Sequence, residues 1–122
     1  MRIFKNREFS KFARKESISN KKLVEAVKHA DEGLIDASYG GGVIKQRIAR
    51  PNAGKSGGYR SIVLYRQGDK AFFVYGFAKS EQDNIDADEV RDFKKLAKIM
   101  FAMTDEQIDV LLKKGSLEEV QP

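Results

Sequence analysis

Apolar residues recur at helical spacing in the first third of the chain and predict two short helices. We expect the first helix to end near Ser17. The second helix can be capped by Ser19 or Asn20 and stops at Gly33. The apolar positions that define the two helices are Phe9, Phe12, Ala13, Leu23, Val27 and Ala30. A short strand beginning at Ile3-Phe4 precedes them.

From residue 34 onward the hydrophobic period changes to two, which is typical of strands. We expect strands over residues 34–39, 43–50, 59–67 and 70–79. Gly68-Asp69 separates the last two and predicts a tight hairpin. In the second strand Ile44 and Ile48 alternate with Lys45 and Arg47, so this strand has one apolar face and one basic face.

The last third of the chain returns to helical spacing. Asp86 and Asp88 open one helix, and the segment Thr104 to Gln107 matches the capping box of a second, shorter helix that ends at Gly115. We expect the tail over residues 116–122 to fray. The order of elements predicts one α+β domain over residues 1–122. It comprises two N-terminal helices, an antiparallel sheet of about four strands, a C-terminal helix and a short helical extension over residues 104–122.

Charge is concentrated in the middle of the chain. Residues 43–82 carry eight bases and two acids, whereas residues 83–122 carry six bases and ten acids. A positive block of this kind is typical of proteins that bind a polyanion, and a basic surface that only maintains solubility is the alternative.

Composition removes several classes of site. The chain has no cysteine, which excludes disulfides, thiolate metal sites and a cysteine nucleophile. The acids Asp83, Asp86 and Asp88 lie at a helix start, where the helix dipole favours carboxylates, so we expect no metal and no cofactor. No apolar run approaches the roughly 20 residues that span a bilayer. We expect a cytoplasmic protein without a membrane partner.

Residues 49–56, Ala-Arg-Pro-Asn-Ala-Gly-Lys-Ser, differ by one residue from a nucleotide-binding P-loop. A P-loop needs a helix directly after it, whereas Gly57-Gly58 and a strand follow here. We therefore expect no nucleotide cofactor. Lys55 could still contact a phosphate of a nucleic acid, and a solvated loop without a ligand is the alternative.

The segment Gly54-Lys55-Ser56-Gly57-Gly58-Tyr59-Arg60, an apolar strand, and then Tyr75-Gly76-Phe77-Ala78-Lys79-Ser80-Glu81 together resemble the RelE branch of the RelE/ParE toxin superfamily. The match is most similar to the HigB-like toxins. It extends over roughly residues 1–103. The resemblance implies a RelE-like fold and a toxin of a type II toxin–antitoxin module. It also implies a metal-independent endoribonuclease that cuts messenger RNA in the ribosomal A site, with a cognate antitoxin, the ribosome and mRNA as partners.

The resemblance also implies site residues. Lys45 and Arg47 occupy the family's basic positions on a central strand, Arg60 the place of its phosphate-binding arginine, and Lys79 the basic position that ends the last strand. Some relatives carry a tyrosine where this chain has Asn84-Ile85. In this chain that role is vacant or falls to Tyr75, Tyr59 or Phe77.

RNA supplies its own nucleophile, the 2′-hydroxyl, so cleavage requires a base, a cationic clamp and an acid. Lysines in a cluster can replace histidine because mutual repulsion lowers the pKa of a lysine. We expect Lys45 or Lys79 to transfer the proton and Arg47 and Arg60 to hold the phosphate. The only histidine, His29, fits a helix surface better than a catalytic site.

The aromatic candidates Tyr59, Tyr75 and Phe77 would stack on a base, and a core position is the alternative for Tyr75 and Phe77. Two other functions stay open at this point. The first is a ParE-like toxin that inhibits DNA gyrase, and the second is an RNA-binding protein without catalytic activity.

Overall fold

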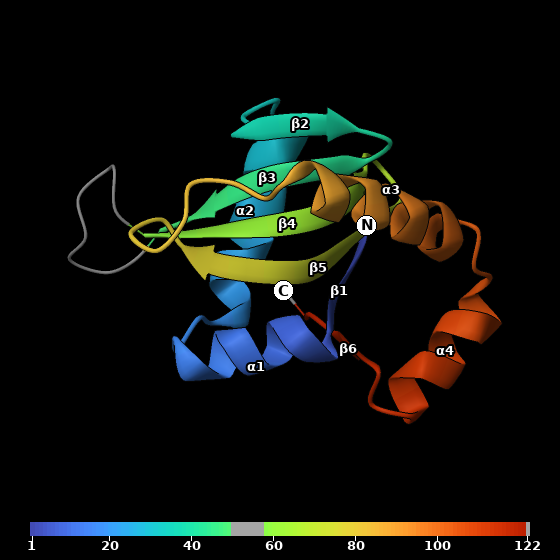
Figure 1. Ribbon diagram of the computed structural model, residues 1–122. Helices are drawn as coiled ribbons and strands as arrows, with labels where there is room; N and C mark the ends of the chain where they lie inside the picture. Colours follow the sequence, from blue (N-terminus) through green and yellow to red (C-terminus); the bar gives the residue numbers. More distant parts are fainter. Residues whose placement is uncertain (50–57, 122) are drawn as a thin grey trace.

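The computed structural model describes residues 1–49 and 58–121 and has a mixed α+β architecture (Figure 1). Within these ranges four helices surround a six-stranded sheet with strand order β2-β3-β4-β5-β1-β6. The strands are β1 (Arg2–Asn6), β2 (Ala37–Gly40), β3 (Val43–Ile48), β4 (Tyr59–Arg66), β5 (Lys70–Ala78) and β6 (Leu117–Glu119). The helices are α1 (Arg7–Lys15), α2 (Asn20–Asp31), α3 (Ala87–Phe101) and α4 (Asp105–Lys113).

The centre of the sheet follows the sequence prediction. Strands β2 to β5 pair in antiparallel order, and Gly68, with φ of 76°, turns the hairpin between β4 and β5. Ser19 caps α2, and both Asp86 and Thr104 complete capping boxes at the starts of α3 and α4. These elements are set by local signals, which explains why periodicity located them.

The edge of the sheet differs from the prediction in two ways. Strand β1 pairs with β5 in parallel, so the sheet is mixed rather than purely antiparallel. The tail does not fray as expected, because Leu117–Glu119 pairs with β1 as β6. Apolar burial explains this pairing: Phe4 is fully buried, and Leu117 and Val120 are almost fully buried.

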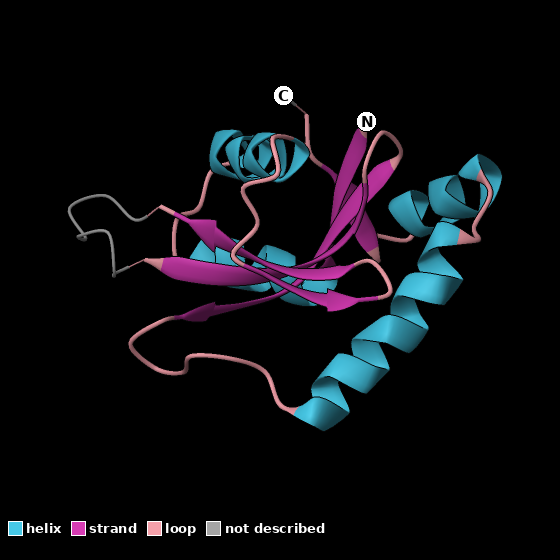
Figure 2. Ribbon diagram, turned by 90° about the horizontal axis from the view of Figure 1, so that it is seen from above, coloured by secondary structure: helices cyan, strands magenta, loops and turns pink. Residues whose placement is uncertain are grey.

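Each face of the sheet packs on its own hydrophobic cluster. Helices α1 and α2 supply Phe9, Leu23 and Ala26 to one cluster, and α3 and α4 supply Ala97 and Ile108 to the other. Figure 2 shows α1 and α3 on opposite sides of the sheet. The face toward α3 also carries the basic alternation of β3, so the position of α3 decides which part of that face stays open.

In the described ranges, no helix combines the length and hydrophobicity that crossing a membrane would require.

Candidate nucleic-acid interface

Two rows of side chains cross the sheet on the face toward α3. Arg47 of β3 lies opposite Arg60 of β4, which in turn lies opposite Phe77 of β5. The neighbouring row consists of Lys45, Ile62 and Tyr75. Because residues two apart on a strand share a face, three cations from two strands gather on one side of the sheet.

Part of this positive charge, that of Arg60, is buried and therefore has little access to solvent. Arg60 is 6% exposed, and Arg47, directly across from it, is exposed. Like charges directly opposite each other on a sheet destabilise it. A cross-strand arginine pair is therefore a feature that packing alone does not favour.

Asp36 supplies the negative charge at this point. Its Oδ2 atom lies 3.5 Å from Lys45 Nζ and 3.3 Å from Arg60 Nε. The side chains of the lysine and the arginine are only 14% and 8% exposed, whereas that of Asp36 is 32% exposed. One carboxylate thus serves two largely buried cations, and positive charge remains in excess around it.

Further contacts fix the orientation of these cations. Arg60 Nη1 donates to the carbonyl of Tyr59 at 3.4 Å, so this bond and the ion pair of Nε with Asp36 together fix the guanidinium. Lys45 Nζ donates to the carbonyl of Asp83 at 3.3 Å. The guanidinium and the ammonium are therefore held in place before any substrate binds.

The segment between β5 and α3 lies against the basic face and is held by side chains from it. The Tyr75 hydroxyl donates to Gln82 Oε1 at 3.3 Å, and the Tyr39 hydroxyl donates to Asn84 Oδ1. Burial, together with nearby carboxylates, raises the pKa of Tyr75 above its ordinary value. This tyrosine is therefore neutral near pH 7, with a proton that it could donate.

The aromatic candidates differ in burial and in the face of the sheet on which they lie. Tyr75 is half-buried on the basic face, and Phe77 lies beneath it at 3% exposure, with ring centroids 5.8 Å apart. Phe77 is thus part of the hydrophobic core, which was the alternative for this residue, and has little surface for stacking on a base.

Tyr59 lies on the face of the sheet opposite to the basic face, so it is not brought together with the other candidate residues. Its ring packs edge-on against Phe12 and its hydroxyl donates to Glu16. Tyr59 precedes Arg60, and neighbours in a strand face opposite sides. The alternation of side chains along a strand therefore already indicated, from the sequence, that Tyr59 and Arg60 lie on opposite faces.

Lys79 lies near the end of the sheet at which Arg60 is found. Lys79 follows β5, and its backbone N–H donates to the carbonyl of Gly58 at 3.2 Å, just before β4 begins. Lys55 lies outside the described residues.

Sequence reasoning missed Asp36 and assigned no role to Gln82. Asp36 comes just before β2, between Ile35 and Ala37, and nothing in that local pattern distinguishes it from an exposed turn residue. Only the sheet brings it to Lys45 and Arg60. In the part of the chain that the structure describes, no group of three or more His, Cys, Asp or Glu could hold a metal ion.

Comparison of the chain with known protein families identifies the family to which it belongs. A family model described as RelE toxin of RelE / RelB toxin-antitoxin system matches residues 1–120. Among curated proteins, none matches the chain. The family match covers nearly all of the sequence, including β6 and the basic face. The chain therefore belongs to the RelE toxin family, as a toxin of a toxin–antitoxin system with an antitoxin as its partner.

Proposed function

We propose that this toxin is an mRNA interferase of the HigB-like branch. It cuts translated mRNA in the ribosomal A site, without a metal, and its antitoxin silences it. The observation that carries the proposal is the row formed by Arg47 and Arg60, with Lys45 in the next row and a single carboxylate between Lys45 and Arg60. A phosphate group would balance the excess charge that Asp36 leaves.

The chemistry is the attack of a ribose 2′-oxygen on the adjacent phosphorus, which expels the 5′-oxygen of the next nucleotide. The product carries a 2′,3′-cyclic phosphate. Arg47 and Arg60 would hold the two non-bridging oxygens, whose negative charge grows in the transition state. Lys45 or Lys79 would remove the 2′-proton, and another proton donor, of which Tyr75 is one candidate, would protonate the leaving oxygen.

Tyr75 is the aromatic side chain best placed to contact a base. It lies on the basic face, in the row of Lys45, and is half-buried, with Phe77 and Phe93 against its ring. Stacking of an unpaired base on its ring would orient the ribose toward the arginine row. The proposal therefore places phosphate and base contacts on adjacent rows of one sheet face.

Replacement of Arg60 tests the proposal directly. Purified toxin is added to translating ribosomes and the cut sites are mapped by primer extension. We expect Arg60→Ala to reduce the cleavage rate at least about 100-fold, since removal of one transition-state donor typically costs this much. Arg60→Lys keeps the charge but loses the forked donors. Its cleavage rate should therefore lie between that of Arg60→Ala and that of the unmodified toxin.

The matched control is Arg91→Ala, which removes a cation from the exposed surface of α3, where its side chain is 62% exposed. Its cleavage rate should equal that of the unmodified toxin. A folded Arg60→Ala variant that cuts at the full rate would refute the assignment. Inhibition of gyrase supercoiling by the unmodified toxin would favour the ParE-like function, and RNA binding without cuts would favour a binding protein.

A further inference from the structure

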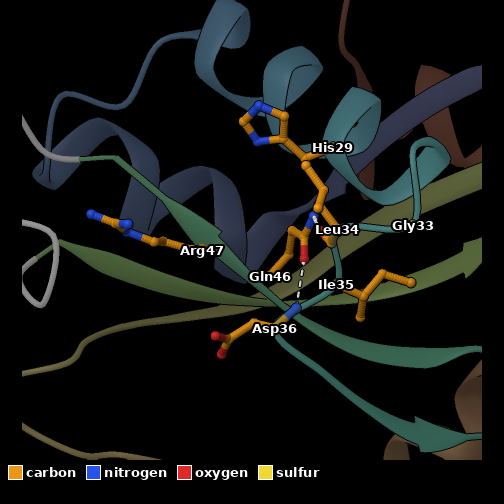
Figure 3. A pocket seen from close by; sticks show the side chains of 7 residues that line it. All are labelled: His29, Gly33, Leu34, Ile35, Asp36, Gln46 and Arg47. Atoms are coloured by element: carbon orange, nitrogen blue, oxygen red, sulfur yellow. Dashed lines mark hydrogen bonds between the residues drawn. The ribbon is translucent and has the colours of Figure 1, made fainter.

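A pocket of about 340 Å³ lies at the edge of the sheet, beside the basic face (Figure 3). It is formed by the end of α2, the segment that leads into β2, and β3. Its lining residues are His29, Gly33, Leu34, Ile35, Asp36, Gln46 and Arg47. Because β2 begins only at Ala37, opposite Lys45, the pocket occupies the space beyond the start of that strand.

The pocket floor is rigid. Gln46, 3% exposed, donates from Nε2 to the carbonyls of Ala26 and Leu34, each at 2.9 Å. Its Oε1 atom accepts the backbone N–H of Asp36 at 3.2 Å. One buried amide therefore ties α2, the following segment and β3 together, and the pocket exists before a ligand arrives.

The walls combine apolar surface with an aromatic ring. Leu34 is 62% exposed, and the imidazole of His29 is exposed at the end of α2. Figure 3 shows His29 above the pocket and Asp36 below it, with Arg47 at its side. An exposed leucine beside an exposed imidazole offers a flat, weakly polar ligand a contact that water does not provide.

Two lining residues also belong to the basic face. Arg47 is in the row with Arg60, and Asp36 is the ion-pair partner of Arg60 and Lys45. A phosphate bound at Arg47 would therefore have the pocket as its immediate neighbour. In RNA, the flat and weakly polar group adjacent to a phosphate is a nucleobase, and a pocket of about 340 Å³ is large enough to hold one.

We propose that the pocket binds an unpaired base of the RNA next to the phosphate that Arg47 and Arg60 contact, with His29 and Leu34 as its walls. The inference rests on the proposed function, because it takes RNA as the ligand of the basic face. It adds a second base contact at the β3 edge of the sheet, whereas Tyr75 lies on β5. Recognition of single-stranded RNA commonly holds splayed bases against such side chains.

His29 gives this proposal a direct spectroscopic test, since the chain contains one histidine. The probe is a dinucleotide with a 2′-O-methyl group, which cannot be cleaved, added to the full chain. We expect the imidazole proton signals of His29 to shift as the dinucleotide saturates the protein. The same dinucleotide lacking one base should bind more weakly and leave these signals in place.

Variants locate the contact. We expect Leu34→Ala and His29→Ala each to weaken dinucleotide binding about 5- to 100-fold, the usual range for loss of one base contact. Lys28→Ala is the matched control, because Lys28 is exposed on the same helix but does not line the pocket. All three variants should keep the melting temperature of the unmodified protein.

Three outcomes would overturn the proposal. The first is saturation of the basic face, seen at the Tyr75 signals, without any shift at His29. The second is failure of the dinucleotide to bind. The third is an antitoxin peptide that shifts the His29 signals while the dinucleotide does not, which would assign the pocket to the partner. The proposed nuclease activity fails separately, as absence of cuts on translating ribosomes, and this failure would not affect a dinucleotide shift at His29.

Discussion

Replacement of Asp36 by asparagine should affect stability and RNA affinity in opposite directions. Asparagine has nearly the same shape but no charge. At an effective dielectric constant of about 20, a pair of unit charges 3.3–3.5 Å apart attracts by roughly 5 kcal/mol before desolvation. Asp36 makes two such contacts, with Lys45 and Arg60.

The net loss of stability is much smaller than the summed attraction. Both cations are largely buried, and removing the partner of a buried charge costs about 3–5 kcal/mol. The carboxylate of Asp36 is 32% exposed, however, and solvent screens it. We therefore expect Asp36→Asn to lower the free energy of unfolding by roughly 1–3 kcal/mol.

The same substitution should strengthen binding of RNA. In the unmodified protein Asp36 competes with a phosphate for Lys45 and Arg60, and in the variant both cations are available. We expect affinity for a non-cleavable oligonucleotide to rise about 3- to 10-fold and to depend more steeply on salt, because more cations neutralise phosphates. Inorganic phosphate should restore part of the lost stability by binding to the folded protein.

The measurements are urea unfolding with and without phosphate and a salt titration of oligonucleotide binding. Asp92→Asn is the matched control, since it removes the same charge at a side chain that is 71% exposed on α3. An Asp36→Asn variant that binds RNA more weakly than the unmodified protein, or that loses no stability relative to Asp92→Asn, would refute the reasoning.

Three further substitutions test the fold around the site. Gly76→Ala should destabilise the protein by about 1–3 kcal/mol in thermal unfolding, because a Cβ there would lie 2.4 Å from the ring of Phe12. Ile108→Ala should cost about 2–5 kcal/mol in urea unfolding, since Ile108 is fully buried although it belongs to the C-terminal extension. Glu119→Gln should cost roughly 1 kcal/mol at pH 7, where the Glu119 carboxylate accepts two hydrogen bonds from Arg2 at 2.9 and 3.0 Å.

Two of these predictions, for Gly76 and Glu119, have a further control. Phe12→Ala should make Gly76→Ala less costly than it is in the unmodified protein, since the two act through one contact. For Glu119, the hydrogen bond from Arg2 lowers the pKa of the carboxyl below its ordinary value. Its stabilising effect is therefore complete above that value and disappears as the pH falls through the lower folded-state pKa. A constant difference between Glu119→Gln and the unmodified protein across this pH range would contradict the assignment.

Much of the fold followed from local pattern. The boundaries of α3 and α4, the hairpin at Gly68 and the basic face of β3 all depend on residues within one or two turns or strand steps of each other. Periodicity and capping act over such short distances, which is why they could be read directly. The shared face of Lys45 and Arg47 was recognised for the same reason.

Other features required residues far apart in the sequence to meet. The segment Leu117–Glu119 becomes a strand only because β1 offers it an edge, and β1 pairs in parallel with β5, where Phe4 is buried and stacks on Phe72. No local signal contains this information. The frayed tail and the purely antiparallel sheet were therefore wrong for one common reason, the non-local choice of strand partners.

The sequence by itself determined the chemistry of this toxin: the block of cations, the alternation that gives β3 a basic face, and the family to which it belongs. Tertiary structure decided how those cations are arranged. Sheet register put Arg47 opposite Arg60, and the segment before β2 brought Asp36 between Lys45 and Arg60. Charge is a property of each residue, whereas its neutralisation depends on which distant residues packing brings within a few ångströms.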